Sequence, residues 1–130
     1  MRIREAHERC VTHIENDNNV ELTNYLTTNA DLPVNEIMDQ NGKTLLHECT
    51  FNDSLKCLKA LLTLVSPRMV KDDIATWINQ KDHGDGFTAL HFASFKGNPD
   101  ACEILIKHGA DIHAKNNFGI NMLHVAAQGD

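Results

Sequence analysis

Three copies of one short pattern constrain this chain more than any other feature. The sequence Thr-Ala-Leu-His at residues 88–91 returns in altered form as Thr-Leu-Leu-His at 44–47 and as Asn-Met-Leu-His at 121–124. Each copy begins two residues after a glycine, and these glycines lie 44 residues apart (42 to 86) and 33 residues apart (86 to 119). Such spacing is typical of a protein that stacks one small structural unit several times.

The most complete copy occupies residues 83–115, and from residue 85 it reads DGFTALHFASFKGNPDACEILIKHGADIHAK. Its G-x-T-x-L-H opening, its mid-repeat glycine and its G-A-D-I-x-A close resemble the ankyrin repeat, whose period is about 33 residues. The resemblance is strong over residues 39–130 and weak over the first 38. It implies an all-α, ankyrin-repeat solenoid of helix-turn-helix units with short hairpin fingers.

Local residue choices in this copy favour two helices per unit. Gly86 lets the chain turn from the finger into the first helix, and Gly97 ends that helix where a positive φ is needed. Asn98 suits the N-cap of the second helix, and Pro99 suits its first position, where a missing N–H does no harm. Gly109 then stops the second helix.

Residues 39–82 form a longer copy, which exceeds the 33-residue period by about eleven residues (44 less 33). In this copy Asp53 takes the place of Gly97, and leucines recur at helical spacing from 55 to 65. Most of the excess falls in 68–77, where we expect a short extra helix packed beside the finger. Its apolar positions recur at three and four residues and are Val70, Ile74, Trp77 and Ile78. Asp72 and Asp73 would form its solvated face or its start.

The two terminal copies are incomplete. Residues 1–38 lack the T-x-L-H signature and contain a highly charged outer helix, as expected of a degenerate capping repeat. Residues 116–130 form a truncated repeat that stops after one helix, which leaves the inner face of that helix without a neighbour. We therefore expect this chain to be the N-terminal part of a longer array.

Composition argues against several classes of function. Eighteen acidic and twelve basic side chains give a net charge of −6, so no nucleic-acid partner is expected. The charged N-terminal segment and the lack of a long apolar stretch predict a soluble segment with no secretory signal and no membrane contact. Four widely spaced cysteines predict reduced core thiols. The expected location is cytoplasmic, or the cytosolic face of a membrane if the chain belongs to a longer protein.

No cofactor, metal site or catalytic group is expected. His7, Cys10 and His13 would sweep about 120° around a helix, which is too wide for one metal ion without further ligands. The run from Asp82 to Gly86 lacks the downstream glutamate of a calcium loop and the lysine of a phosphate loop, and it is better explained as the tip of a finger.

Three of the eight histidines share one position of the repeat and are His47, His91 and His124. Stacking holds them about 10 Å apart, so they do not form one catalytic centre. We expect each imidazole to hydrogen-bond its own turn and the neighbouring repeat, while the threonine hydroxyl supports the same turn.

The expected functional surface is the concave groove with its finger tips. In ankyrin repeats, residues after the turn glycine and near the end of the first helix face this groove, and partners bind there. The corresponding positions of this chain hold Lys43, Phe51, Asn52, Asp85, Phe87, Phe95, Lys96, Lys115, Phe118, Ile120 and Gln128. Four of the five phenylalanines therefore point at or near one groove, which suggests a docking site. The alternative is that Phe51, Phe95 and their neighbours stack on one another and bind nothing.

The predicted function is a non-enzymatic protein-protein interaction module that binds a peptide or protein. A second resemblance gives the alternative: the segment GINMLHVAAQGD at 119–130 is similar to a repeat of ankyrin-bearing DHHC palmitoyltransferases. That resemblance would make this chain the N-terminal substrate-recognition segment of a larger enzyme. Asp-His-His-Cys itself is absent, so no catalytic residue carries over.

Overall fold

The computed structural model describes residues 2–122, and in that range its regular elements are all helices. An isolated antiparallel bridge joins Met38 to Thr44 at the base of the first finger. The helices are α1 (Arg2–Glu15), α2 (Asn19–Thr28), the 3-10 turn η1 (Val34–Glu36), α3 (Leu45–Phe51), α4 (Leu55–Val65), α5 (Lys71–Ile78), α6 (Ala89–Phe95) and α7 (Pro99–Lys107).

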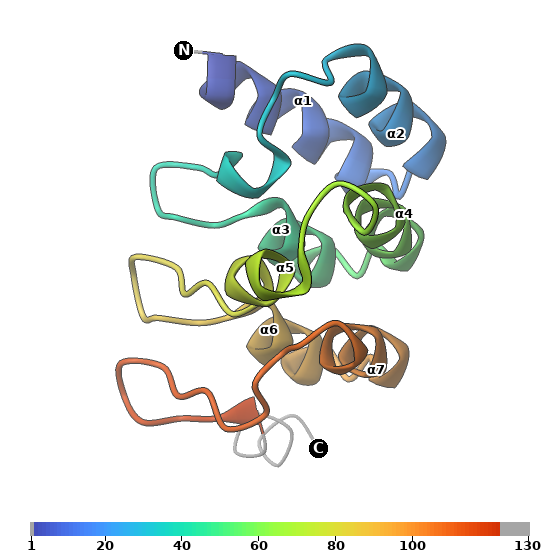
Figure 1. Cartoon of the computed structure of the whole chain (residues 1–130). Helices are drawn as coiled ribbons and strands as arrows, with labels where there is room; N and C mark the ends of the chain where they lie inside the picture. Colours follow the sequence, from blue (N-terminus) through green and yellow to red (C-terminus); the bar gives the residue numbers. More distant parts are fainter. Residues whose placement is uncertain (1, 123–130) are drawn as a thin grey trace.

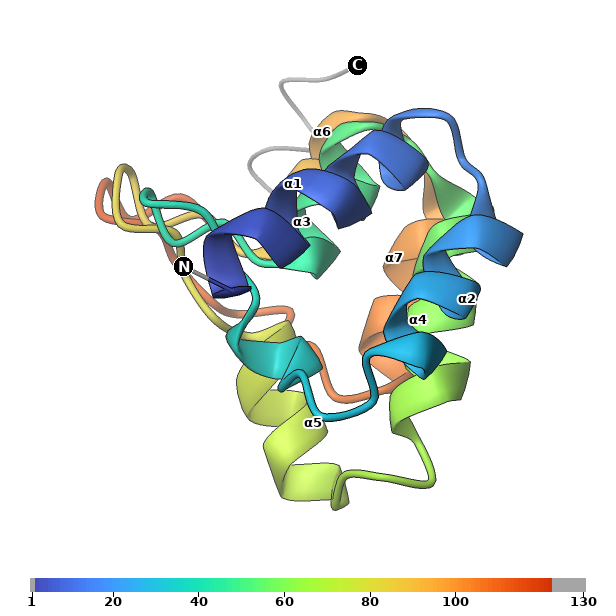
Figure 2. The ribbon, with the colours of Figure 1, turned by 90° about the horizontal axis from the view of Figure 1, so that it is seen from above.

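The helices stack in two columns. Helices α1, α3 and α6 follow one another in the first column, and α2, α4 and α7 form the second (Figure 1). Seen from above, the helices of each column lie over one another, and the finger loops project together from the side of the first column (Figure 2). This is the ankyrin-repeat solenoid that the sequence predicted.

The fingers are closed by backbone hydrogen bonds. In each finger a backbone N–H at the start donates to a carbonyl at the end. The three bonds run from residue 39 to 43 at 3.1 Å, from 82 to 87 at 2.9 Å and from 116 to 120 at 2.9 Å. Neighbouring fingers are also tied together, because the His83 N–H donates to the Asn41 carbonyl at 2.7 Å and the Asn117 N–H donates to the Asp85 carbonyl at 2.8 Å. The fingers therefore form one continuous edge of the stack.

Apolar stripes at helical spacing build the core. In α1 the buried residues are Ala6, Cys10 and Ile14, and in α4 they are Cys57, Leu58, Leu61, Leu62 and Val65. They belong to one cluster that runs through the stack from α1 to Leu105 of α7. Because each unit buries its faces against the next, stability is shared between units.

The T-x-L-H signature is an N-terminal helix cap. Thr44 precedes α3 and accepts from the His47 N–H, while His47 Nδ1 accepts from the Thr44 N–H at 3.0 Å. Thr88 and His91 repeat this reciprocal arrangement at α6, also at 3.0 Å. The second imidazole nitrogen of each reaches the next finger, which confirms the predicted role of both histidines. His124 lies outside the described residues.

The predicted helix boundaries are confirmed at several points. The Asn98 side chain caps α7 by accepting from the Ala101 N–H at 3.1 Å, and Pro99 is the first residue of α7. Gly97 has φ +67°, and Asp53, its counterpart, adopts φ 56°. An aspartate tolerates this left-handed region better than most residues.

The inserted helix α5 was predicted three residues too early. It starts at Lys71, and Val70 is an N-cap residue with 66% of its surface exposed, so its placement on the apolar stripe was wrong. Ile74, Trp77 and Ile78 are buried as predicted, and Asp72 and Asp73 are exposed in the first turn.

The C-cap of α5 fastens the insertion to the third unit. Asn79 Nδ2 donates to the Gly109 carbonyl at 2.9 Å, and Asn79 Oδ1 accepts from the Asp111 N–H at 2.7 Å. A Cβ at Gly109 would lie 3.0 Å from the Ala75 Cβ. The extra helix is therefore packed closely against the loop that follows α7.

The four cysteines are free thiols. Cys10, Cys49 and Cys57 are buried, as predicted, whereas Cys102 is half-buried. Burial raises the pKa of the Cys10 thiol to about 12, and the same cause raises the pKa of Cys57 to about 12. Among residues 2–122, no helix combines the length and the apolar character needed to cross a bilayer.

Candidate functional site

A hollow of about 260 Å³ opens between the ends of α3 and α6 and the bases of two fingers. Its lining is largely aromatic and consists of Phe51, Phe87, His91, Phe92, Phe95, Lys96 and Ile120. Five of the predicted groove residues therefore lie around one depression, although they come from three different units of the sequence.

Phe92 is the centre of this aromatic group, although it was not among the predicted groove residues. Its ring centroid lies 5.9 Å from that of Phe51 and 5.6 Å from that of Phe87. His47 contacts the same ring edge-on at 5.7 Å. A signal for Phe92 was present, because it precedes Phe95 by three residues and so shares one side of α6.

Phe51 and Phe95 do not stack on each other. Phe51 packs against Phe92 and is still 50% exposed, whereas Phe95 has no ring partner among the described residues and is 62% exposed. The predicted alternative was that these rings stack on one another. Phe51 does pack on a neighbouring ring, that of Phe92, but Phe95 does not pack on any ring among the described residues. An exposed phenylalanine beside an apolar hollow is available to a partner.

Two lysines give the rim a local positive charge. Lys96 Nζ lies 5.0 Å from the centroid of the Phe51 ring, and Lys43 Nζ lies 5.5 Å from the same centroid. These are cation–π distances, which hold both ammonium groups over the aromatic face. In a chain with a net charge of −6, this rim is a local exception.

The remaining predicted groove residues lie elsewhere. Asn52 uses its side-chain amide to cap α3, because Nδ2 donates to the Glu48 carbonyl at 2.9 Å. Three further residues are exposed on the fingers and do not line the hollow: Asp85, Lys115 and Phe118. Phe118 is 71% exposed. Gln128 lies outside the described residues.

The other candidate groups have structural roles in this region. Asp82 Oδ1 accepts from the N–H groups of Gly86 and Phe87 at 2.8 and 3.2 Å, so this run is the finger turn that was predicted. Cys10 is buried in the core cluster.

Residues 85–117 match the ankyrin repeat family. This part of the chain is an ankyrin repeat. Ankyrin repeat and SOCS box protein 3 of Bos taurus is 49% identical over 33% of this chain and 8% of its own length. Protein phosphatase 1 regulatory subunit 27 of Homo sapiens is 43% identical over 34% of this chain and 29% of its own length. The chain thus spans less than a third of either relative.

The ankyrin fold also has a close match among solved structures. A chain in the crystal structure of the yeast ribosomal protein Rps3 in complex with its chaperone Yar1 superimposes with a TM-score of 0.86. The alignment covers 97% of this chain and 85% of that chain at 22% identity. At this identity the similarity describes the fold, and the binding surface has to be argued from this chain's own residues.

Proposed function

We propose that this ankyrin stack is a non-enzymatic protein-binding module that seats an apolar anchor of a peptide segment in the hollow beside Phe95. The observation that carries the proposal is the 260 Å³ aromatic hollow, whose rim residue Phe95 is 62% exposed. Binding hot spots are usually a few large side chains in such desolvated pockets. Covering the hollow would remove apolar surface from water on both partners.

The charge of the rim supports an acidic partner segment. The ammonium groups of Lys43 and Lys96 lie 5.5 and 5.0 Å from the Phe51 ring centroid, where a carboxylate next to the anchor could pair with them. Rim charges of this kind contribute mainly to association rate and specificity. The proposed ligand is therefore an acidic peptide with an aromatic or large aliphatic anchor.

The named relatives are consistent with a binding role. One is a regulatory subunit of protein phosphatase 1, and the structural match comes from a complex between a ribosomal protein and its chaperone. A cytoplasmic location, which the four free thiols support, forms part of the same proposal.

Selection from a displayed peptide library tests this function. Wild-type protein should enrich peptides with an apolar anchor next to Asp or Glu, and Phe95→Glu should no longer bind them. The matched control is Val20→Glu, because Val20 is a comparably exposed apolar residue on α2, at 60%. Both variants should melt close to wild type, since neither buries the new charge. If Phe95→Glu retained binding, or if Val20→Glu lost it equally, the hollow would not be the binding site.

The DHHC alternative keeps the same binding role for this segment and adds a catalytic domain beyond it. The similarity that suggested it lies at residues 119–130, most of which fall outside the described residues. In a native protein of that class, a Cys-rich motif between hydrophobic spans would follow Asp130. A coding sequence without such a motif would reject this alternative.

A further inference from the structure

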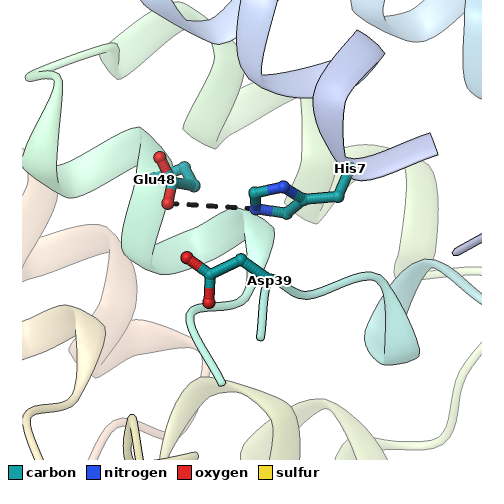
Figure 3. A group of neighbouring side chains, drawn as sticks. All are labelled: His7, Asp39 and Glu48. Carbon is teal, nitrogen blue, oxygen red and sulfur yellow. Dashed lines mark ion pairs between the residues drawn. The ribbon is translucent and has the colours of Figure 1, made fainter. Parts of the chain in front are cut away.

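Three potential metal ligands from three different elements meet beside the N-terminal helix. They are His7 on α1, Asp39 at the start of the first finger and Glu48 on α3 (Figure 3). One ligand atom of each lies within 4.8 Å of the other two. The distance from His7 Nε2 to Glu48 Oε1 is 3.9 Å, which is too long for a hydrogen bond.

The His7 imidazole is the unusual member of this group. Only 12% of its side chain is exposed, and Nε2 is buried without a hydrogen-bond partner among residues 2–122. Buried polar atoms are almost always paired, so an unpaired one needs an explanation. Burial lowers the pKa of His7 and so favours the neutral imidazole. The neutral ring is the form that binds metal ions, because it offers a nitrogen lone pair.

Asp39 is held in place by the finger. Its Oδ1 accepts from the backbone N–H groups of Asn41 and Lys43, each at 2.9 Å. These bonds hold the carboxylate in place, as the hydrogen-bond partners of a metal ligand do. The other oxygen, Oδ2, has no hydrogen-bond partner among the described residues.

Glu48 brings a second carboxylate into the same confined space. Its side chain is 14% exposed. Burial raises the pKa of Glu48, the nearby Asp39 charge adds to this rise, and the Lys43 charge offsets part of it. Two carboxylates at this distance repel each other. A bound divalent cation would remove that repulsion.

We propose that His7, Asp39 and Glu48 bind one Zn²⁺ ion, with water as a fourth ligand. One imidazole nitrogen and two carboxylate oxygens suit zinc, whereas calcium and magnesium take oxygen ligands. Zinc bonds of about 2.0–2.2 Å place tetrahedral ligand atoms about 3.3 Å apart. The ligand atoms must therefore approach one another by about 1.5 Å at most. Rotation of the His7 and Glu48 side chains toward the fixed Asp39 carboxylate would bring them closer.

Access fits this assignment, and at Glu48 the negative charge of Asp39 outweighs the positive charge of the nearby Lys43. A cavity of about 490 Å³ adjoins the group, is lined by His7 and Asp39 among others, and would admit the ion and its water. Arg4 also lines the cavity, but its Nε lies 3.9 Å from the Glu8 carboxylate, which offsets its charge. The ion would join α1, the first finger and α3. It would thereby fasten the degenerate first repeat to the second.

Calorimetric titration of the metal-stripped chain with ZnCl₂ tests the proposal. We expect one Zn²⁺ per chain and a melting temperature that rises with the logarithm of free Zn²⁺. The Co²⁺ complex should show visible bands of a four-coordinate ion without the intense near-ultraviolet band that thiolate ligands give. That second observation separates this site from the four free cysteines.

Three conservative variants identify the ligands. His7→Gln, Asp39→Asn and Glu48→Gln should each weaken Zn²⁺ binding about tenfold or more. Asp39→Asn retains the acceptor that holds the finger, and Glu48→Gln removes a confined charge, so the fold should survive both changes. His13→Gln, on the same helix, is the control and should bind Zn²⁺ like the wild type. Failure of the wild-type chain to bind Zn²⁺ saturably, unaltered binding by all three variants, or a Co²⁺ complex with thiolate bands would overturn the proposal.

Discussion

His47 and Phe87 are joined across 40 residues of sequence by a hydrogen bond of 2.8 Å between the imidazole Nε2 and the phenylalanine carbonyl. Because His47 Nδ1 accepts from the Thr44 N–H, the ring is neutral and Nε2 carries the donating proton. The bond ties α3 to the base of the next finger. It also fixes the backbone of a residue whose ring lines the hollow, so the repeat signature positions the candidate binding site.

The equivalent bond of the next unit yields a stability prediction. His91 is 2% exposed, accepts from the Thr88 N–H at 3.0 Å and reaches the Ile120 carbonyl at 2.9 Å. His91→Ala leaves both partners unpaired and should lower the free energy of unfolding by about 1–3 kcal/mol. Urea denaturation followed by circular dichroism measures this loss. The exposed His113 supplies the control, and a urea midpoint equal to wild type in His91→Ala would contradict the prediction.

The same residue makes stability depend on pH. Burial lowers the pKa of His91 in the folded protein below its ordinary value of 6.5. Below pH 6.5 the imidazole therefore binds a proton in the unfolded chain but stays neutral in the folded chain. The free energy of unfolding then falls as the pH falls, by up to about 1.4 kcal/mol per pH unit for one such group. Above pH 6.5 this contribution to stability is complete.

A variant without the imidazole isolates this effect. His91→Gln should flatten the fall of unfolding free energy between pH 6.5 and 5.5, a window set by the ordinary pKa of 6.5, whereas His113→Gln should follow the wild-type curve. The measurement is a series of urea titrations at fixed ionic strength. Equal slopes for wild type and His91→Gln would assign the pH dependence to other groups.

Two glycines with similar backbone angles should respond differently to substitution. Gly86 and Gly97 have φ +79° and φ +67°, but a Cβ at Gly86 would lie 2.6 Å from Asn117 Oδ1, whereas one at Gly97 would meet nothing within 4 Å. Gly97→Ala should cost only the left-handed backbone term of about 1–2 kcal/mol. Gly86→Ala should cost more, because it also displaces the next finger. Thermal melts of both variants test this, and equal losses would refute the steric part.

Much of the fold could be predicted because the repeat signature acts locally. The cap at Thr88, the N-cap Asn98 and the left-handed Asp53 each follow from the chemistry of one or two turns. The start of α5 was missed by contrast, because Val70 continues the apolar spacing although it is an exposed cap residue. Periodicity alone does not locate where a short helix begins.

The sites were harder to predict because they depend on contacts between units. His7 was grouped with Cys10 and His13 on its own helix, whereas its observed neighbours are 32 and 41 residues away, at Asp39 and Glu48. Phe92 was assigned no role in the groove, yet three other rings meet it. Helical spacing describes one element and cannot specify which faces of three elements converge.

The charge of the hollow's rim gives the last prediction. Lys96→Glu places a carboxylate where the proposed partner presents its own, so affinity for a selected acidic peptide should fall about tenfold at low salt and less at high salt. Lys59→Glu, at an exposed position on α4, changes the net charge equally, from −6 to −8, and should bind nearly as well as wild type. Fluorescence anisotropy with the labelled peptide gives both affinities. An equal loss in the two variants would mean that overall charge, and not the Lys96 rim, attracts the partner.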